Sequence, residues 1–173
     1  MGFDLYGNGS RLYDAKEFPI YSKYKNLDWD EREKHDDWEK ESSTFWEQEH
    51  AIDRANGTYF RANVWWWRRL WDFTCKVCDD VMEEWEQDAG ASNDGIEIKE
   101  ETCLKMVPLM EAALKDGSAM EYQKVVKEYM DAAPKDKSGC YDKDHWMANY
   151  PFDVEFFQDF ITFVKRSQGF TIS

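Results

Sequence analysis

The stretch Asn63–Gln87, NVWWWRRLWDFTCKVCDDVMEEWEQ, holds five of the nine tryptophans of this 173-residue chain. At about 100° per residue, its large apolar side chains fall on one half of a helix: Val64, Trp66, Trp67, Leu70, Trp71, Phe73, Val77, Cys78, Val81, Met82 and Trp85. Asn63 is a suitable N-cap, and Gly90 and Gly95 mark the far end. We therefore predict one buried helix of about six or seven turns, against which the rest of the chain packs.

Trp65 departs from this pattern, because it falls on the polar side of the helix with Arg68 and Arg69. Two interpretations are open. In the first, another segment covers the first turn and one of the arginines stacks on the indole, a cation–π contact of about 0.5 to 2 kcal/mol. In the second, Trp65 belongs to a surface that binds a ligand or a partner.

Weaker patterns place the other elements. Helical periods indicate helices over 100–116, 118–133 and 153–168, and one or two amphipathic helices within 28–56. Alternating residues indicate short strands at 3–6, 96–98 and 170–172, whereas residues 11–27 show no sustained period and suggest irregular chain or a short edge strand. The expected fold class is mainly α (α+β), with about five helices around the long Trp-rich helix and a small sheet pairing the N- and C-terminal strands.

Three local signals refine these helices. Pro108 lies inside the 100–116 helix and predicts a kink or a break near Leu104, because it removes a backbone donor. Ser118 with Glu121 has the form of a capping box. Asp153 is placed to cap the last helix.

The net charge of −14 is concentrated in two blocks. Residues 28–50 contain ten acidic and three basic residues, and residues 79–101 contain ten acidic residues and Lys99. This charge argues against direct nucleic-acid binding, which requires cations to neutralise phosphates, and favours a basic protein partner. The candidate partner-binding acids are Asp28, Asp30, Glu31, Glu33, Asp36, Asp37, Asp79, Asp80, Glu83 and Glu84.

Length and composition predict a single domain over 1–173, in which 28–56 is an acidic helical insertion. No apolar run approaches the roughly 18 residues of a membrane span, and the N-terminus lacks the regions of a signal peptide. We therefore expect a soluble, cytosolic protein with no membrane partner.

No catalytic or cofactor motif is recognisable, so we expect a protein that is not an enzyme and has no cofactor. Cys75 and Cys78 form a CxxC that could, with Cys103 and Cys140, make a four-thiolate zinc site. The motif lies in mid-helix on an apolar face, however, and buried cysteine is a common core residue. The sequence therefore predicts reduced cysteines and no metal.

Four stretches resemble a group of small uncharacterised proteins of phages and bacteria: GFDLYG at 2–7, YFRANVWWWRRLWDF at 59–73, NDGIEI at 93–98 and YPFDVEFFQDFITFVKRSQGFTI at 150–172. The resemblance covers under half of the chain and carries no known activity, so it transfers no catalytic residue. Some members look as though they hold a zinc-finger-like CxxCxGxG insertion before the YPF segment, where this chain keeps only Cys140. The resemblance implies phage or prophage origin and action in a bacterial cytoplasm.

Two functional hypotheses follow. The leading one is a non-enzymatic accessory protein that binds a basic host protein, such as a nucleic-acid-handling or defence factor, through its acidic blocks. The alternative is a protein that binds or sequesters a nucleotide-like ligand at the start of the central helix. There Trp65 would stack on the base, and Arg61, Arg68 and Arg69 would bind phosphate.

Overall fold

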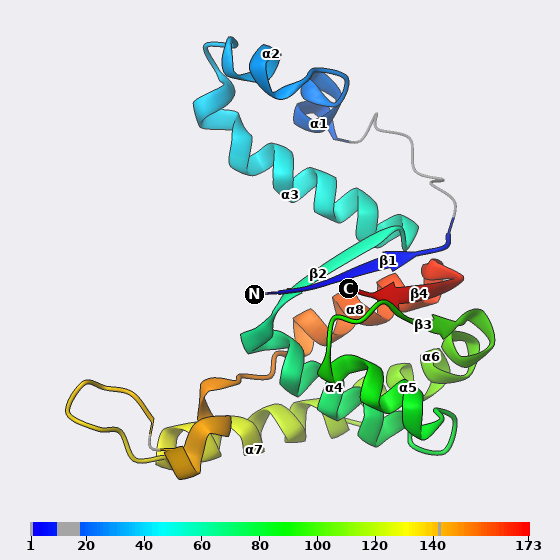
Figure 1. The fold of residues 1–173 in the computed structure, drawn as a ribbon, viewed down its shortest axis with the longest axis vertical. Coiled ribbons are helices and arrows are strands. Elements are labelled where there is room, and N and C mark those ends of the chain that lie inside the picture. The colour runs from blue at the N-terminus through cyan, green and yellow to red at the C-terminus, as the bar shows by residue number, and fades with distance from the viewer. Residues whose placement is uncertain (1, 10–17, 142) are drawn as a thin grey trace.

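The computed structural model describes residues 2–9, 18–141 and 143–173, and within them a four-stranded antiparallel sheet crosses the molecule (Figure 1). Its strands run in the order β2-β1-β4-β3. The predicted pairing of the terminal strands is confirmed, since Leu5 lies opposite Ile172. The three predicted strands are present, and the fourth, β2, was not predicted from the sequence. The strand bounds are β1 Gly2–Gly7, β2 Tyr59–Asn63, β3 Ile96–Lys99 and β4 Gly169–Ile172.

One face of the sheet forms a wall of the core. Side chains alternate along each strand, and cross-strand register aligns the apolar ones, as in the pairs Phe3 with Ala62 and Leu5 with Phe60. Seven inward-facing side chains are buried, and Ile96, opposite Ile172, is partly buried. The buried ones are Phe3, Leu5, Phe60, Ala62, Ile98, Phe170 and Ile172. Three helices cover this face, namely α4 (Val64–Cys78), α6 (Glu100–Lys115) and α8 (Val154–Ser167), and α7 (Ser118–Ala132) packs outside α6.

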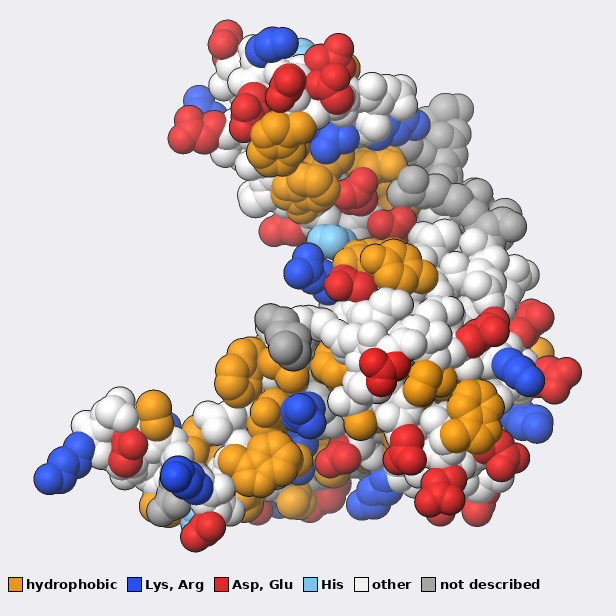
Figure 2. Space-filling view, viewed as in Figure 1, with side chains coloured by type: hydrophobic (Ala, Val, Ile, Leu, Met, Phe, Trp, Pro, Cys, Tyr) orange, Lys and Arg blue, Asp and Glu red, His pale blue; other side chains and the backbone are white. Residues whose placement is uncertain are grey.

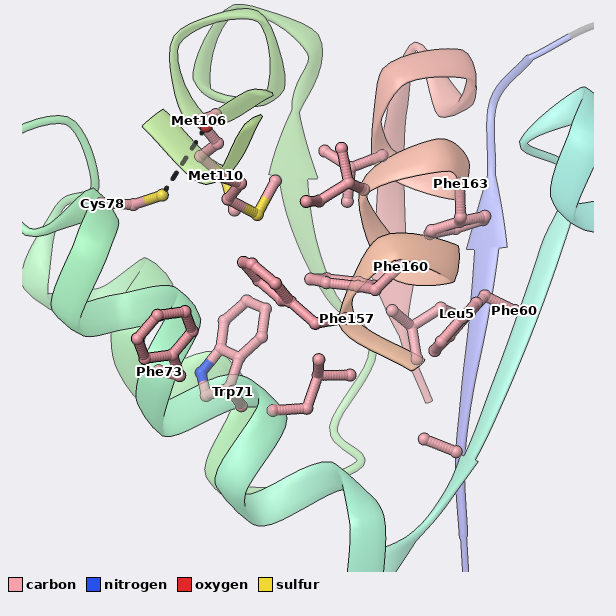
Figure 3. Close-up of a cluster of buried hydrophobic side chains, with 14 of the residues drawn as sticks. Leu5, Phe60, Trp71, Phe73, Cys78, Met106, Met110, Phe157, Phe160 and Phe163 are labelled. Carbon is pink, nitrogen blue, oxygen red and sulfur yellow. Dashed lines mark hydrogen bonds between the residues drawn. The ribbon is translucent and has the colours of Figure 1, made fainter. Parts of the chain in front are cut away.

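The phenylalanines of α8 link the helices to the sheet. In Figure 3, Phe157 lies beside Trp71 of α4 and Met110 of α6, and Phe160 lies between Phe157 and the strand residues Leu5 and Phe60. The Phe160 ring also lies 5.4 Å from Phe60 and 6.1 Å from Phe170, which belong to two different strands. The mainly α (α+β) fold is therefore confirmed, and the sheet shares one core with α4, α6, α7 and α8.

The central helix is shorter than predicted. Helix α4 ends at Cys78, whose carbonyl accepts hydrogen bonds from Val81 and Met82, and the chain turns before α5 (Glu84–Asp88) and the 3₁₀ turn η2 (Ala89–Ala91). The prediction of an unbroken helix to residue 87 was wrong, because this second segment folds back along α4. As a result Trp85, predicted to be buried, is 47% exposed. The prediction that Trp66 is buried was also wrong, since this residue of the first turn of α4 is exposed.

Two stacked tryptophans explain the return of the chain. The rings of Trp67 and Trp71 lie 5.0 Å apart, and the edge of Phe160 meets both. Their indole Nε1 atoms donate to the carbonyls of Gly90 (2.8 Å) and Gln87 (2.7 Å). A Cβ on Gly90 would lie 2.1 Å from the Trp71 ring, so only glycine permits this approach. The pair therefore packs on the last helix, α8, at Phe160.

Residues 18–56 form an arm that extends away from the sheet (Figure 1). It contains α1 (Pro19–Tyr24), α2 (Trp29–Glu33) and α3 (Trp38–Asn56), held by a second apolar cluster of Tyr21, Tyr24, Trp38, Phe45 and Ile52. The helices expected within 28–56 are confirmed. Residues 19–24 form a helix rather than irregular chain, with Pro19 in its first turn, and residues 10–17 lie outside the described residues. The end of α3 packs on α8 and β2.

Local capping predictions had mixed outcomes. Asn63 and Asp153 cap α4 and α8 as expected. Helix α6 runs unbroken through Pro108, which lies on its exposed side. Ser118 is not an N-cap, because Gly117 occupies that position and Asp116 accepts the hydrogen bond from the Ser118 N–H. Within the described residues, no helix combines the length and the apolar composition needed to span a membrane.

Truncation of Trp71 tests the importance of the stacked pair. The Trp71 side chain is 5% exposed, so Trp71→Ala is expected to lower the free energy of unfolding by about 3 to 5 kcal/mol. Trp65→Ala is the matched control, since Trp65 is 51% exposed and its loss should cost less than about 1 kcal/mol. Chemical denaturation measures both values, and equal losses would contradict the assigned core.

Candidate functional site

The first turn of α4 is partly covered by the segment before α8. Trp65 packs on the ring of Tyr150, with ring centroids 5.4 Å apart, and the guanidinium of Arg68 lies 5.4 Å from the centre of that same ring. Trp146, in the 3₁₀ segment η3 (Lys143–Asn149), meets Tyr150 edge-on at 5.6 Å. A segment therefore covers the first turn, as one interpretation predicted, but the ring that Arg68 contacts is Tyr150.

The other two predicted ligand-binding arginines make different contacts. Arg69 donates to the carbonyls of Tyr150 (3.4 Å) and Met147 (3.3 Å), so it holds the η3 segment in place. Arg61 extends from β2, where its Nε lies 3.6 Å from a carboxylate oxygen of Asp4. Trp65 and Arg68 contact the ring of Tyr150 and Arg69 contacts its carbonyl, whereas Arg61 lies apart on β2. The structure therefore does not bring Arg61, Trp65, Arg68 and Arg69 into one site.

A cavity of about 310 Å³ lies between α4, the α5–η2 segment and η3. Arg68 is the one predicted ligand-binding residue that lines it, and two acids, Asp72 and Asp88, lie on the same walls. This mixture of charges favours neither an anion nor a cation. The full lining is Arg68, Trp71, Asp72, Cys75, Gln87, Asp88, Gly90, Ala91, Trp146 and Met147.

The first acidic block lies at the far end of the arm, on α2 and its flanks (Figure 1). All six predicted acids there are exposed: Asp28, Asp30, Glu31, Glu33, Asp36 and Asp37. Four of them also have intramolecular roles. Asp28 and Glu31 form a capping box, Glu33 accepts from the indole of Trp29, and Asp37 pairs with Lys23. Basic side chains are interspersed among these acids (Figure 2), so this block is partly neutralised.

The second acidic block surrounds the turn between α4 and α5. The four predicted acids, Asp79, Asp80, Glu83 and Glu84, are all exposed. Glu86 points inward instead, where it accepts hydrogen bonds from the Thr102 hydroxyl (2.7 Å) and the Glu83 N–H (2.9 Å). This block lies toward the opposite end of the longest axis from α2 (Figure 1). The two blocks are therefore separate surfaces.

Each acidic block contains an exposed tryptophan whose exposure was not predicted from the sequence. Trp29 is 53% exposed next to Asp28 and Asp30, and Trp85 is 47% exposed next to Glu84. The helical period had placed Trp85 in the core. The signal that could have found it is the surrounding sequence, because Glu83, Glu84 and Glu86 leave few apolar neighbours on which an indole could pack.

The cysteines are free thiols in different environments. Burial raises the pKa of Cys75 and of Cys78 to about 12 and that of Cys103 to about 11, whereas Cys140 is exposed. The Cys78 thiol lies 3.9 Å from the Met106 carbonyl (Figure 3). In the described part of the chain, no three His, Cys, Asp or Glu side chains gather as metal ligands would. Cys75 and Cys78 therefore act as core residues here.

Comparison with protein-family models, with curated proteins and with solved structures found no match to this chain. The resemblance of the 59–73 stretch to phage and bacterial proteins therefore stays a prediction. Function has to be inferred from the residues described above.

Thiol alkylation tests the cysteine environments. At pH 8 a thiol of pKa about 12 is ionised to only about 1 part in 10⁴. Iodoacetamide is therefore expected to modify Cys140 first and to leave Cys75, Cys78 and Cys103 unmodified, with the reactivity of these three rising as pH approaches 11. Mass spectrometry of the native and the denatured protein counts the alkylated cysteines in each state. Rapid alkylation of Cys78 in the native protein would contradict its burial.

Proposed function

We propose that this chain is a non-enzymatic accessory protein, of phage or prophage origin, that binds a basic host protein through the acidic surface around α5. The supporting observation is the exposure of Trp85 within residues 79–101, a segment that contains ten acidic residues and only one lysine. The Trp85 indole presents a large apolar surface within a group of carboxylates. This is the arrangement expected of a contact residue.

The chemistry of that surface fits a Lys- or Arg-rich partner. Carboxylates at Asp79, Asp80, Glu83 and Glu84 would steer the partner and set its orientation. The Trp85 ring would take up apolar side-chain stems and the guanidinium or ammonium group by a cation–π contact. Tryptophan is enriched among the residues that dominate interface free energy, whereas rim charges mainly govern the rate of association.

The first acidic block offers a second, weaker surface of the same kind. Trp29 lies there beside Asp28 and Asp30, but its indole Nε1 already donates to Glu33 at 2.8 Å and its ring meets Trp38 edge-on. Two cations also lie in this part of the arm, since Lys23 pairs with Asp37 and Arg32 lies over the Phe45 ring. Because of these intramolecular contacts, we assign the main partner contact to the second block.

Retention of basic proteins from a bacterial lysate tests the proposal. Wild-type protein is expected to retain a basic partner at about 0.05 M salt and to lose it at about 0.5 M, because the Debye length shortens. Trp85→Ala should weaken retention of that partner by about 2 kcal/mol or more, roughly 30-fold. The matched control is Trp65→Ala, an equally exposed tryptophan outside both acidic blocks.

Variants of the two blocks separate their contributions. Replacing Asp79, Asp80, Glu83 and Glu84 by their amides should abolish retention, and the amide replacements of Asp30 and Asp36 should leave most of it. The proposal fails if the wild-type protein retains no basic protein at low salt. It also fails if Trp65→Ala and Trp85→Ala behave alike.

A further inference from the structure

A second cavity, of about 260 Å³, opens where α3 meets β2. These two elements converge at the inner corner of the hollow that separates the arm from the helices below the sheet (Figures 1 and 2). Its lining residues are His50 and Arg54 from α3 and Tyr59, Phe60, Arg61 and Asn63 from β2 and its end. It lies apart from the ten predicted partner-binding acids and from the cavity beside η3.

The charge of this lining is opposite to that of the whole protein. The chain has 36 acidic and 22 basic residues, yet the six lining residues include two arginines and a histidine and no acid. His50 and Arg54 are four residues apart on α3 and so project from the same side, and Arg61 meets them from the neighbouring strand. Collecting like charges is unfavourable unless counter-charges accompany them.

Two carboxylates just outside the lining position the arginines. Asp159 of α8 lies 3.3 Å from the Nε of Arg54, and Asp4 of β1 lies 3.6 Å from the Nε of Arg61. Tyr59 donates its hydroxyl proton to the same Asp4 carboxylate. A guanidinium has five N–H donors, so a contact at Nε leaves the N–H groups of its two terminal nitrogens to donate to a ligand. The Arg61 side chain remains 63% exposed, which makes it accessible to a ligand.

The other lining groups add donors and a flat wall. The His50 and Tyr59 rings are stacked, with centroids 6.1 Å apart and planes 25° apart. The side-chain oxygen of Asn63 already accepts from the N–H groups of Trp65 and Trp66, so its Nδ2 is the atom that remains to donate. Arginine, histidine and this amide nitrogen all present N–H groups. The site therefore matches a ligand that accepts hydrogen bonds and carries negative charge.

We propose that this cavity binds a phosphoryl group, either as free phosphate or as a small phosphate monoester. Arginine forks match the geometry of phosphate oxygens and bind them in pairs. The volume of about 260 Å³ lies below the roughly 300 to 1,000 Å³ typical of pockets that enclose a whole drug-sized ligand. The cavity thus suits the phosphate and its nearest atoms, with any larger part of the ligand lying in the open hollow.

Isothermal titration calorimetry on the full chain, at fixed ionic strength, tests this site with inorganic phosphate, AMP and adenosine. Phosphate and AMP are expected to bind and adenosine is not. Arg61→Gln should weaken binding by about tenfold or more, because it removes a charged donor. Arg68→Gln is the matched control, since Arg68 is an exposed arginine that contacts Tyr150 outside this cavity.

Backbone NMR of the wild-type protein gives an answer that does not depend on any variant folding. Phosphate should shift amide signals of residues 50–63 and leave those of residues 146–150 unchanged. The proposal is overturned if neither phosphate nor AMP binds, if adenosine binds as well as AMP, or if Arg68→Gln loses as much affinity as Arg61→Gln. It is also overturned if the shifts map to residues 146–150.

Discussion

The structure depends on the need of two buried indoles for hydrogen-bond acceptors. An unpaired buried donor costs about 1 to 3 kcal/mol, so a buried indole N–H is strongly favoured to find an acceptor. Trp67 and Trp71 find theirs at Gly90 and Gln87. The segment after α4 must therefore return along the helix, which forces α4 to end and leaves the Asp79–Glu84 turn at the surface.

The same core sets the position of the arm and of the cavity between α3 and β2. Phe160 of α8 contacts the stacked tryptophans on one side and the sheet residues Phe60 and Phe170 on the other. Its helix also provides Asp159, which pairs with Arg54 of α3. Because α8 touches both α3 and β2, the angle at which the cavity opens is fixed by packing within the main core. Gly57 makes the tight reversal between α3 and β2, with a φ of 67°.

Local patterns predicted the elements whose causes are local. Helices α6, α7 and α8 and the Asn63 and Asp153 caps follow from periods and side-chain hydrogen bonds within a few residues. The break after Cys78 could not be predicted in that way, because Val81 and Met82 continue the apolar period and the cause of the break lies at Gly90. Strand β2 was missed for a similar reason, since Tyr59–Asn63 gains its hydrogen bonds from β1, more than fifty residues earlier. Trp85 was predicted to be buried because it continues the apolar period of α4, although that helix ends at Cys78.

The candidate sites show the same division between features with local causes and features whose causes lie far along the chain. Exposed acids were predictable, because runs of carboxylates seldom bury. The cationic cavity was hidden, because His50 and Arg54 lie in a segment whose composition is acidic, and they meet Arg61 only through the junction of α3 with β2. At physiological ionic strength charges are screened over about 8 Å, so the carboxylates that govern an anion in the cavity are those nearest to it. Two such carboxylates are Asp4 and Asp159, which belong to neither acidic block and hold the arginines in position. A strongly acidic protein can therefore keep a local anion site, provided that its acids near the site are the ones that orient the cations.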